Sequence, residues 1–180
     1  MELLTGLGLA IPAGLNAYIP LLSVAVAQQF GWIQLEGRFA LIGEWWSIAL
    51  IGVLLLVEIV ADKVPAVDTV NDAIQTFVRP AAGGLLVAAA GAGNDFVHPV
   101  VWVVAGVLLA GGVHAAKATS RPAVNVTTAG TGAPLVSTVE DLSALAMSIA
   151  AIAVPVLAVL ALLGVVVLIV WRRGRLRRAA

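Results

Sequence analysis

Long stretches of this chain carry no charge, and this strongly limits what it can fold into. Residues 142–171 contain no Asp, Glu, Lys or Arg. The whole chain is 61% hydrophobic and 11% charged, whereas a soluble domain is about a quarter charged. The composition therefore predicts an all-α polytopic membrane protein, with residues 1–180 forming a single transmembrane domain.

The basic residues are unevenly distributed along the chain. Half of the ten lie in residues 172–180, directly after the last apolar stretch. The positive-inside rule places such a cluster in the cytoplasm. We therefore expect a basic cytoplasmic C-terminal tail on a protein of the bacterial inner membrane. Nucleic-acid binding is a poor interpretation of arginines that follow an apolar helix directly.

One segment, residues 58–80, concentrates charge between two apolar stretches. A charged group at the centre of a bilayer costs roughly 2.5–3.5 kcal/mol on insertion scales. The segment is therefore where we expect binding, chemistry or a structural ion pair. Its six charged residues are Glu58, Asp62, Lys63, Asp68, Asp72 and Arg79.

The apolar stretches predict about five membrane-spanning helices, with four and six as the bounds. The predicted spans are residues 3–29, 46–61, 80–92, 100–116 and 139–171. Pro12, Asn16 and Pro20 interrupt the first span. A broken helix survives in lipid only where protein or a water-filled cavity satisfies its freed backbone groups. It therefore either lines a site or is a kinked structural helix whose glycines allow close packing.

Three connecting regions leave the path of the chain open. Residues 67–78 have an amphipathic helical pattern, and Asp68 is a candidate cap for its start. The span at 80–92 is short, so it either extends back into that segment or fails to cross. Residues 139–171 would make about 50 Å of helix, which is one long kinked helix or two crossings. Polar connections are expected at 30–46 and 117–138.

An internal repeat relates residues of about 46–78 to about 100–135. The sequence GVLL at 52–55 recurs at 106–109, and PAVD at 65–68 recurs as PAVN at 122–125. The alignment makes Lys63 equivalent to Lys117. Repeats with broken helices at corresponding places are typical of transporter cores. A helical hairpin duplicated for structural reasons is the alternative.

Glu58 and Asp62 are four residues apart, so both carboxylates fall on one helix face. They are weak candidates for a hard-cation or proton site, and an ion pair with Lys63, Lys117 or Arg79 is the alternative. Glu140 follows Ser137 and Thr138, a pattern typical of a helix start. The candidate pathway residues are Asn16, Glu58, Asp62, Lys63, Asp68, Arg79, Lys117, Asn125, Glu140 and Asp141.

The sequence does not point to an enzyme. Cysteine is absent, so a thiolate metal site and a cysteine nucleophile are excluded. No nucleophile with a base, phosphate-binding loop or pair of metal-binding histidines is evident. We expect no cofactor and no nucleic-acid partner. The expected partners are the lipid bilayer, a small solute or ion, and further copies of the chain in a homo-oligomer.

Several motifs resemble a bacterial membrane family described as domain of unknown function 4126. They are GLNAYIPLL, VEIVADKVPAVDTVND, TFVRPAAGG, the pair Lys117 and Arg121, and STVED. This resemblance spans nearly the whole chain and implies several membrane helices but no particular activity. A fainter similarity is to calcium/manganese–proton exchangers. There the chain departs from the family motif, because Gly112 and Ala116 replace the acids in the second repeat.

Two functions are consistent with these observations. The first is a small transporter or channel with a polar pathway at broken helices. The second is a membrane scaffold or lipid-binding protein whose buried charges hold helices together.

Overall fold

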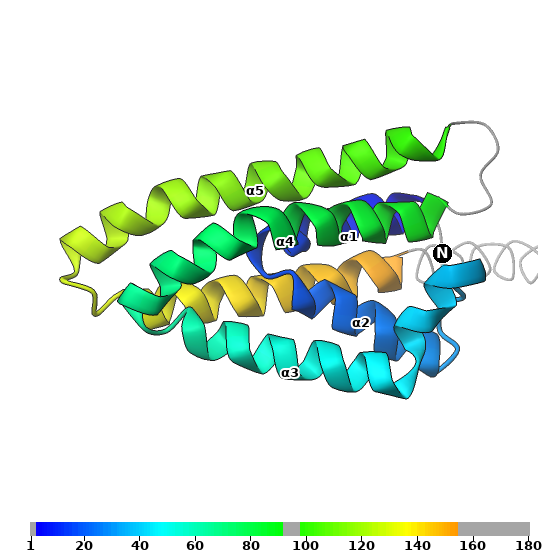
Figure 1. Ribbon diagram of the computed structural model, residues 1–180, viewed down its shortest axis with the longest axis horizontal. Coiled ribbons are helices and arrows are strands. Elements are labelled where there is room, and N and C mark those ends of the chain that lie inside the picture. Colours follow the sequence, from blue (N-terminus) through cyan, green and yellow to red (C-terminus); the bar gives the residue numbers. More distant parts are fainter. Residues whose placement is uncertain (1–2, 92–97, 155–180) are drawn as a thin grey trace, which may run out of the picture.

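The computed structural model describes residues 3–91 and 98–154, which form an elongated bundle of helices (Figure 1). No strand occurs within these two ranges. The elements are α1 (Leu3–Leu15), α2 (Tyr18–Gln29), the 3-10 helix η1 (Gly37–Gly43), α3 (Trp45–Ala61), α4 (Pro65–Gly91), α5 (Pro99–Thr127) and the helix Ala133–Val154.

α1 and α2 form a hairpin that enters the bundle and returns to the end where it began. Gly6 in α1 packs against Ala90 near the end of α4, and Gln28 near the end of α2 packs against Gly43. These contacts lie at one end of the bundle (Figure 1). The two helices are about 20 and 18 Å long, against a hydrocarbon core of roughly 30 Å. Residues 3–29 therefore do not form the single span that the sequence predicts.

Small residues allow α1, α4 and α5 to approach closely. Gly14 in α1 lies against Ala110 and Val113 of α5. A Cβ atom added at Gly83 in α4 would lie 2.6 Å from the carbonyl oxygen of Gly106 in α5. Helices in lipid associate through this kind of close packing. α4 and α5 thus hold α1, the first helix of the hairpin.

Some of the described helices have the length and apolar character of membrane spans. Three pass this test, namely Val70–Gly91 within α4, Pro99–Thr127 and Ala133–Val154. η1 and α3 together would make a fourth span, bent by 62°. The sequence predicts about five crossings, and the described residues contain fewer candidates partly because the first predicted span folds back. The part of the last predicted span after Val154, and the basic tail at 172–180, lie outside the described residues.

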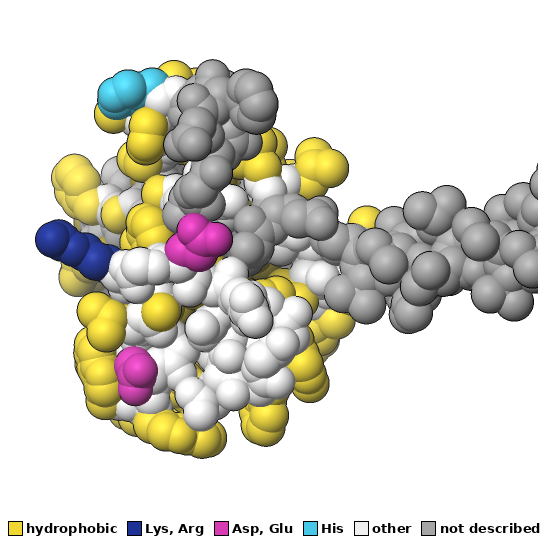
Figure 2. Space-filling model, turned by 90° about the vertical axis from the view of Figure 1, so that its right-hand side faces the viewer, with side chains coloured by type: hydrophobic (Ala, Val, Ile, Leu, Met, Phe, Trp, Pro, Cys, Tyr) yellow, Lys and Arg dark blue, Asp and Glu magenta, His cyan; other side chains and the backbone are white. Residues whose placement is uncertain are grey.

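One end of the bundle carries exposed tryptophans. Trp32, Trp45 and Trp46 are all exposed, and we call this end the tryptophan end. Figure 2 views the bundle from that end, where hydrophobic side chains form the rim and charged side chains are few. Tryptophans concentrate at membrane–water interfaces. The tryptophan end is therefore where the bundle meets one interface.

Two helices continue further than the sequence predicts. α4 runs through Pro80, so the short third span does extend back into the amphipathic segment. α5 runs through Pro122, so most of the predicted polar connection at 117–138 is helical. Proline is tolerated in membrane helices where neighbouring groups satisfy the freed carbonyls. A proline there is a weaker stop signal than in a soluble helix.

Two predicted helix starts are also wrong. Asp68 lies inside the first turns of α4, which begins at Pro65, so it does not cap the helix. Glu140 and Asp141 lie about two turns inside a helix that begins at Ala133. In both cases the helix begins at an earlier point than the polar residues indicate, and a proline lies within its first two residues.

The two copies of the predicted repeat have different local structures. Residues 61–63 are the end of α3 and the turn that follows, whereas residues 115–117 lie inside α5. Lys63 and Lys117 therefore occupy different surroundings. The duplication itself stays a prediction from sequence.

Candidate functional site

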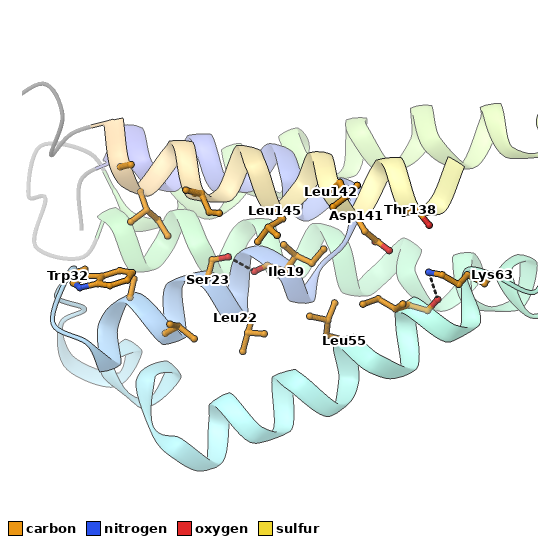
Figure 3. A pocket seen from close by; sticks show the side chains of 16 residues that line it. Ile19, Leu22, Ser23, Trp32, Leu55, Lys63, Thr138, Asp141, Leu142 and Leu145 are labelled. Atoms are coloured by element: carbon orange, nitrogen blue, oxygen red, sulfur yellow. Dashed lines mark hydrogen bonds between the residues drawn. The ribbon is translucent and has the colours of Figure 1, made fainter. Parts of the chain in front are cut away.

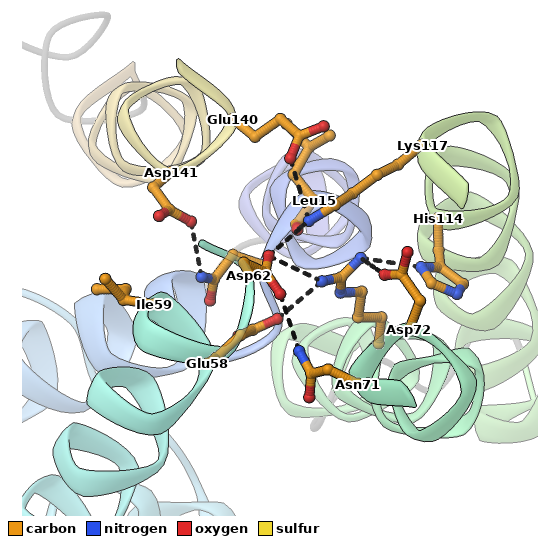
Figure 4. A network of polar contacts seen from close by, with 12 residues as sticks. Leu15, Glu58, Ile59, Asp62, Asn71, Asp72, His114, Lys117, Glu140 and Asp141 are labelled. Atoms are coloured by element: carbon orange, nitrogen blue, oxygen red, sulfur yellow. Dashed lines mark hydrogen bonds and ion pairs between the residues drawn. The ribbon is translucent and has the colours of Figure 1, made fainter. Parts of the chain in front are cut away.

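Polar side chains from five parts of the chain meet inside the bundle (Figure 4). They come from the tip of the α1–α2 hairpin, the end of α3, α4, α5 and the helix Ala133–Val154. We call this group the charge network. Its members are Asn16, Glu58, Asp62, Asn71, Asp72, Arg79, His114, Lys117, Arg121, Glu140 and Asp141.

Arg79 lies at the centre of one half of the network and is 0% exposed. Its Nη2 atom donates to Glu58 Oε1 at 2.9 Å and lies 3.7 Å from Asp62 Oδ2. Its Nη1 atom lies 3.6 Å from Asp72 Oδ1 and 3.0 Å from His114 Nδ1. A guanidinium only donates hydrogen bonds, so His114 Nδ1 is the acceptor in this contact.

Lys117 lies at the centre of the other half. Its Nζ atom lies 3.0 Å from Asp62 Oδ2 and 3.2 Å from Glu140 Oε2. Arg121, one turn further along α5, also pairs with Glu140. Asp62 Oδ1 accepts from Asn71 Nδ2 at 2.9 Å. Asp62 thus connects the two halves, because Arg79 and Lys117 share its Oδ2 atom.

Asp62 follows the last residue of α3 and lies outside the candidate spans. Burial alone would raise the pKa of its carboxyl. The positive charges of Lys117 and Arg79, together with the hydrogen bond from Asn71, instead hold the pKa below its ordinary value. The Asp62 carboxyl is therefore charged.

The hairpin tip brings two helix ends into this network. The carbonyl oxygen of Leu15, at the end of α1, accepts from Lys117 Nζ at 3.0 Å. Asn16 Oδ1 accepts from the backbone N–H groups of Tyr18 and Ile19 at 3.0 and 3.2 Å, as a helix cap does. The C-terminal end of α1 thus faces a cation, as the helix dipole favours. The free amides at the start of α2 have a side-chain acceptor.

Asn16 also joins the tip to the last described helix. Its Nδ2 atom donates to Asp141 Oδ1 at 2.9 Å. The carboxyl group of Asp141 is therefore linked through Asn16 to the positive end of α2. This arrangement explains why an asparagine, with one acceptor and one donor group, stands at the break.

The acids of the network outnumber its bases. Five carboxyl groups face three basic side chains, so negative charges would outnumber positive ones by two if all these groups were ionised. One oxygen of Glu58, Oε2, is buried without a hydrogen-bond partner. The excess of carboxyl groups therefore allows the network to take up protons or a cation. The acids are Glu58, Asp62, Asp72, Glu140 and Asp141, and the bases are Arg79, Lys117 and Arg121.

The structure brings together seven of the ten candidate residues from the sequence. Lys63 lies outside the network, and its Nζ atom donates to the carbonyl of Ile59 at 3.2 Å. Asn125 lies two turns beyond Lys117 on α5, with a buried Oδ1 atom that has no hydrogen-bond partner. The side chain of Asp68 lies outside the described residues.

The metal interpretation of Glu58 and Asp62 gains no support. Their oxygens contact Arg79, Lys117 and Asn71. Within residues 3–91 and 98–154, no group of three or more His, Asp or Glu is arranged to hold a metal ion.

Sequence reasoning missed four members of the network. Arg121 follows Lys117 by four residues, but the sequence predicts a polar connection there, and that prediction hides the helix face that the two residues share. Asp72 and Asn71 precede Arg79 by about two turns of one helix, a signal that was available. His114 stands alone in the sequence, so nothing near it indicates its contact with Arg79.

A family model matches residues 3–174, almost the whole chain, and is described as Domain of unknown function (DUF4126). The chain belongs to the DUF4126 family. No curated protein and no solved structure matches it significantly. The geometry of this DUF4126 protein is therefore the basis for any proposal about its function. Its apolar helices are those of a membrane protein.

Proposed function

We propose that this protein moves a small solute or ion across the membrane and is not an enzyme. The observation that carries the proposal is the hairpin tip. Two helices that do not cross end together, inside the bundle, in a network of polar and ionisable side chains. Discontinuous helices whose ends face polar groups within the membrane are a recurring design of transporter sites.

The excess of carboxyl groups supports the same proposal. A buried network with more carboxyl groups than basic side chains binds a proton or a cation more readily than a balanced one. Glu58 is the strongest candidate for the exchangeable site, because its Oε1 atom is held by Arg79 while its Oε2 atom has no partner. Protonation of Glu58 would weaken its ion pair with Arg79, and deprotonation would restore it.

Flux into liposomes tests this proposal. Purified protein would be reconstituted with a trapped pH-sensitive dye, and proton movement followed under imposed gradients of K⁺, Na⁺ or Mg²⁺. We expect the wild type to move protons under at least one gradient and Glu58→Gln to lose at least 90% of that rate, on the order of a tenfold loss. Glu36→Gln, which changes an exposed carboxylate, is the matched control and should retain the wild-type rate.

Two results would overturn the proposal. One is a wild-type rate equal to that of protein-free liposomes under every gradient. The other is equal flux in wild type and Glu58→Gln, since the network would then not lie on the pathway.

A structural role is the second candidate, and one observation favours it. Arg79 and Lys117 are each held by carboxylates from other segments of the chain, as in a lock between helices. If the network only locks the helices, Glu58→Gln lowers the melting temperature in detergent while no ion moves in the wild type. Assembly into a homo-oligomer fits either candidate and is tested by light scattering of the purified protein.

A further inference from the structure

An apolar groove runs between α2, α3 and the helix Ala133–Val154 (Figure 3). Its volume is about 880 Å³, within the range of about 300–1,000 Å³ of ligand pockets. Most of its lining is aliphatic, with Leu22, Leu55, Leu145 and Ile149 among the side chains. The groove is separate from the charge network except at Asp141, which belongs to both.

The groove has one apolar end and one polar end. Trp32 lies at the first, and Lys63, Thr138 and Asp141 gather at the second (Figure 3). From Thr138 to Ala153 the lining follows the last described helix for about 22 Å. This is the shape expected for an extended hydrocarbon chain with a polar head.

The polar end lies at the depth of a membrane interface. Trp45 marks the tryptophan end, and Lys63 lies about 27 Å away along α3 at the helical rise of 1.5 Å per residue. The hydrocarbon core is roughly 30 Å thick. Lys63 is therefore near the interface opposite the tryptophans, where a lipid head of that leaflet would lie.

The charges at the polar end are of both signs and are not paired with each other. The Lys63 ammonium donates to the carbonyl oxygen of Ile59 in α3. Asp141 accepts from Asn16 through Oδ1. These two described side chains form no ion pair with each other, so a group that carries one charge of each sign fits between them.

We propose that this groove binds a phospholipid with a primary ammonium head, of the phosphatidylethanolamine type. One acyl chain lies along the aliphatic lining. The phosphate contacts Lys63, and the ammonium donates to Asp141. The inference stands on the groove and its polar end and does not depend on transport.

Lipid selectivity tests the proposal on the full chain. Thermal unfolding in detergent would be followed during titration with phosphatidylethanolamine, phosphatidylcholine or phosphatidylglycerol of identical acyl chains. A ligand of the folded state raises the melting temperature. We expect phosphatidylethanolamine to bind at least about tenfold more tightly than the other two, because only it offers both a phosphate and N–H donors.

Two variants locate the effect. Lys63→Gln should weaken phosphatidylethanolamine binding about tenfold or more. Leu145→Trp, which fills the groove, should abolish binding of all three lipids. Leu108→Trp, on an exposed part of α5 outside the groove, is the matched control.

Equal stabilisation by the three lipids would overturn the proposal, and so would a preference for phosphatidylglycerol. Unchanged phosphatidylethanolamine affinity in Lys63→Gln or unchanged binding in Leu145→Trp would overturn it too. The wild-type titration remains decisive if a variant does not fold.

Discussion

At the scale of single residues, the stability of the molecule depends on basic side chains that are buried away from water. Arg79 is fully buried and contacts side chains from α3, α4 and α5. Burying a charge is costly, and removing one partner leaves the other uncompensated. The effect of a substitution here should therefore depend on what it leaves unpaired.

Arg79→Met removes the guanidinium and leaves the Glu58 carboxylate without its partner. We expect a loss of about 3–5 kcal/mol in the free energy of unfolding, measured by denaturant titration in detergent. The double variant Arg79→Met with Glu58→Gln should recover part of this loss, because both partners are then uncharged. Arg38→Met, on exposed η1, should stay within about 0.5 kcal/mol of wild type. A small loss in the free energy of unfolding of Arg79→Met would mean that water reaches this site.

Asn16→Ala removes the cap of α2 and the link to Asp141. We expect a loss of about 1–2 kcal/mol, read from the same titration. Thr119→Ala is the control, since this exposed hydroxyl on α5 bonds only to carbonyls of its own helix. Equal stability of the Asn16 and Thr119 variants would show that the tip does not need its side-chain cap.

At the scale of elements, small residues decide which helices can touch. The faces of α4 and α5 meet at Gly83 and Gly106, where each backbone would collide with a Cβ on the other. Elsewhere on α5, Gly112 has nothing within 4 Å of its added Cβ position. Gly106 therefore has no space for a side chain, whereas Gly112 on the same helix does.

Gly106→Ala should force α4 and α5 apart and lower the melting temperature, at a cost of about 1–3 kcal/mol. Gly112→Ala should be neutral or stabilise by up to about 1 kcal/mol, because alanine favours helix more than glycine does. Thermal unfolding of the two variants side by side measures the difference. Similar melting temperatures for both would contradict the close packing of these helices.

The sequence predicted much of this arrangement but not the path of the chain through the bundle. The helical membrane class and the break near Asn16 follow from residue type and spacing, and the pairing of Glu58 and Asp62 with Arg79 or Lys117 is one of the two alternatives that the sequence leaves open. The return of the hairpin does not, because a broken span and a hairpin share one apolar composition. Arg121 and His114 joined the network through tertiary contacts that no local pattern records.

At the scale of the whole molecule, the bundle has two unlike ends joined by a hairpin that reaches only part of the way. The tryptophan end holds both ends of the hairpin, the start of α3 and the start of α5 (Figure 1). The turn between α5 and the last described helix lies at the opposite end. The hairpin tip therefore presents its helix ends to the charge network from one side only.

Labelling of single cysteines tests this account most directly, and the chain has no cysteine of its own. One cysteine each would replace Leu4 near the start of α1, Leu41 in η1 and Val126 at the end of α5, all exposed. A membrane-impermeant maleimide would then be applied to sealed vesicles of known orientation. We expect Leu4→Cys and Leu41→Cys to react from the same side and Val126→Cys from the other. Reaction of Leu4→Cys and Leu41→Cys from opposite sides would show that α1 and α2 cross the membrane and contradict the hairpin.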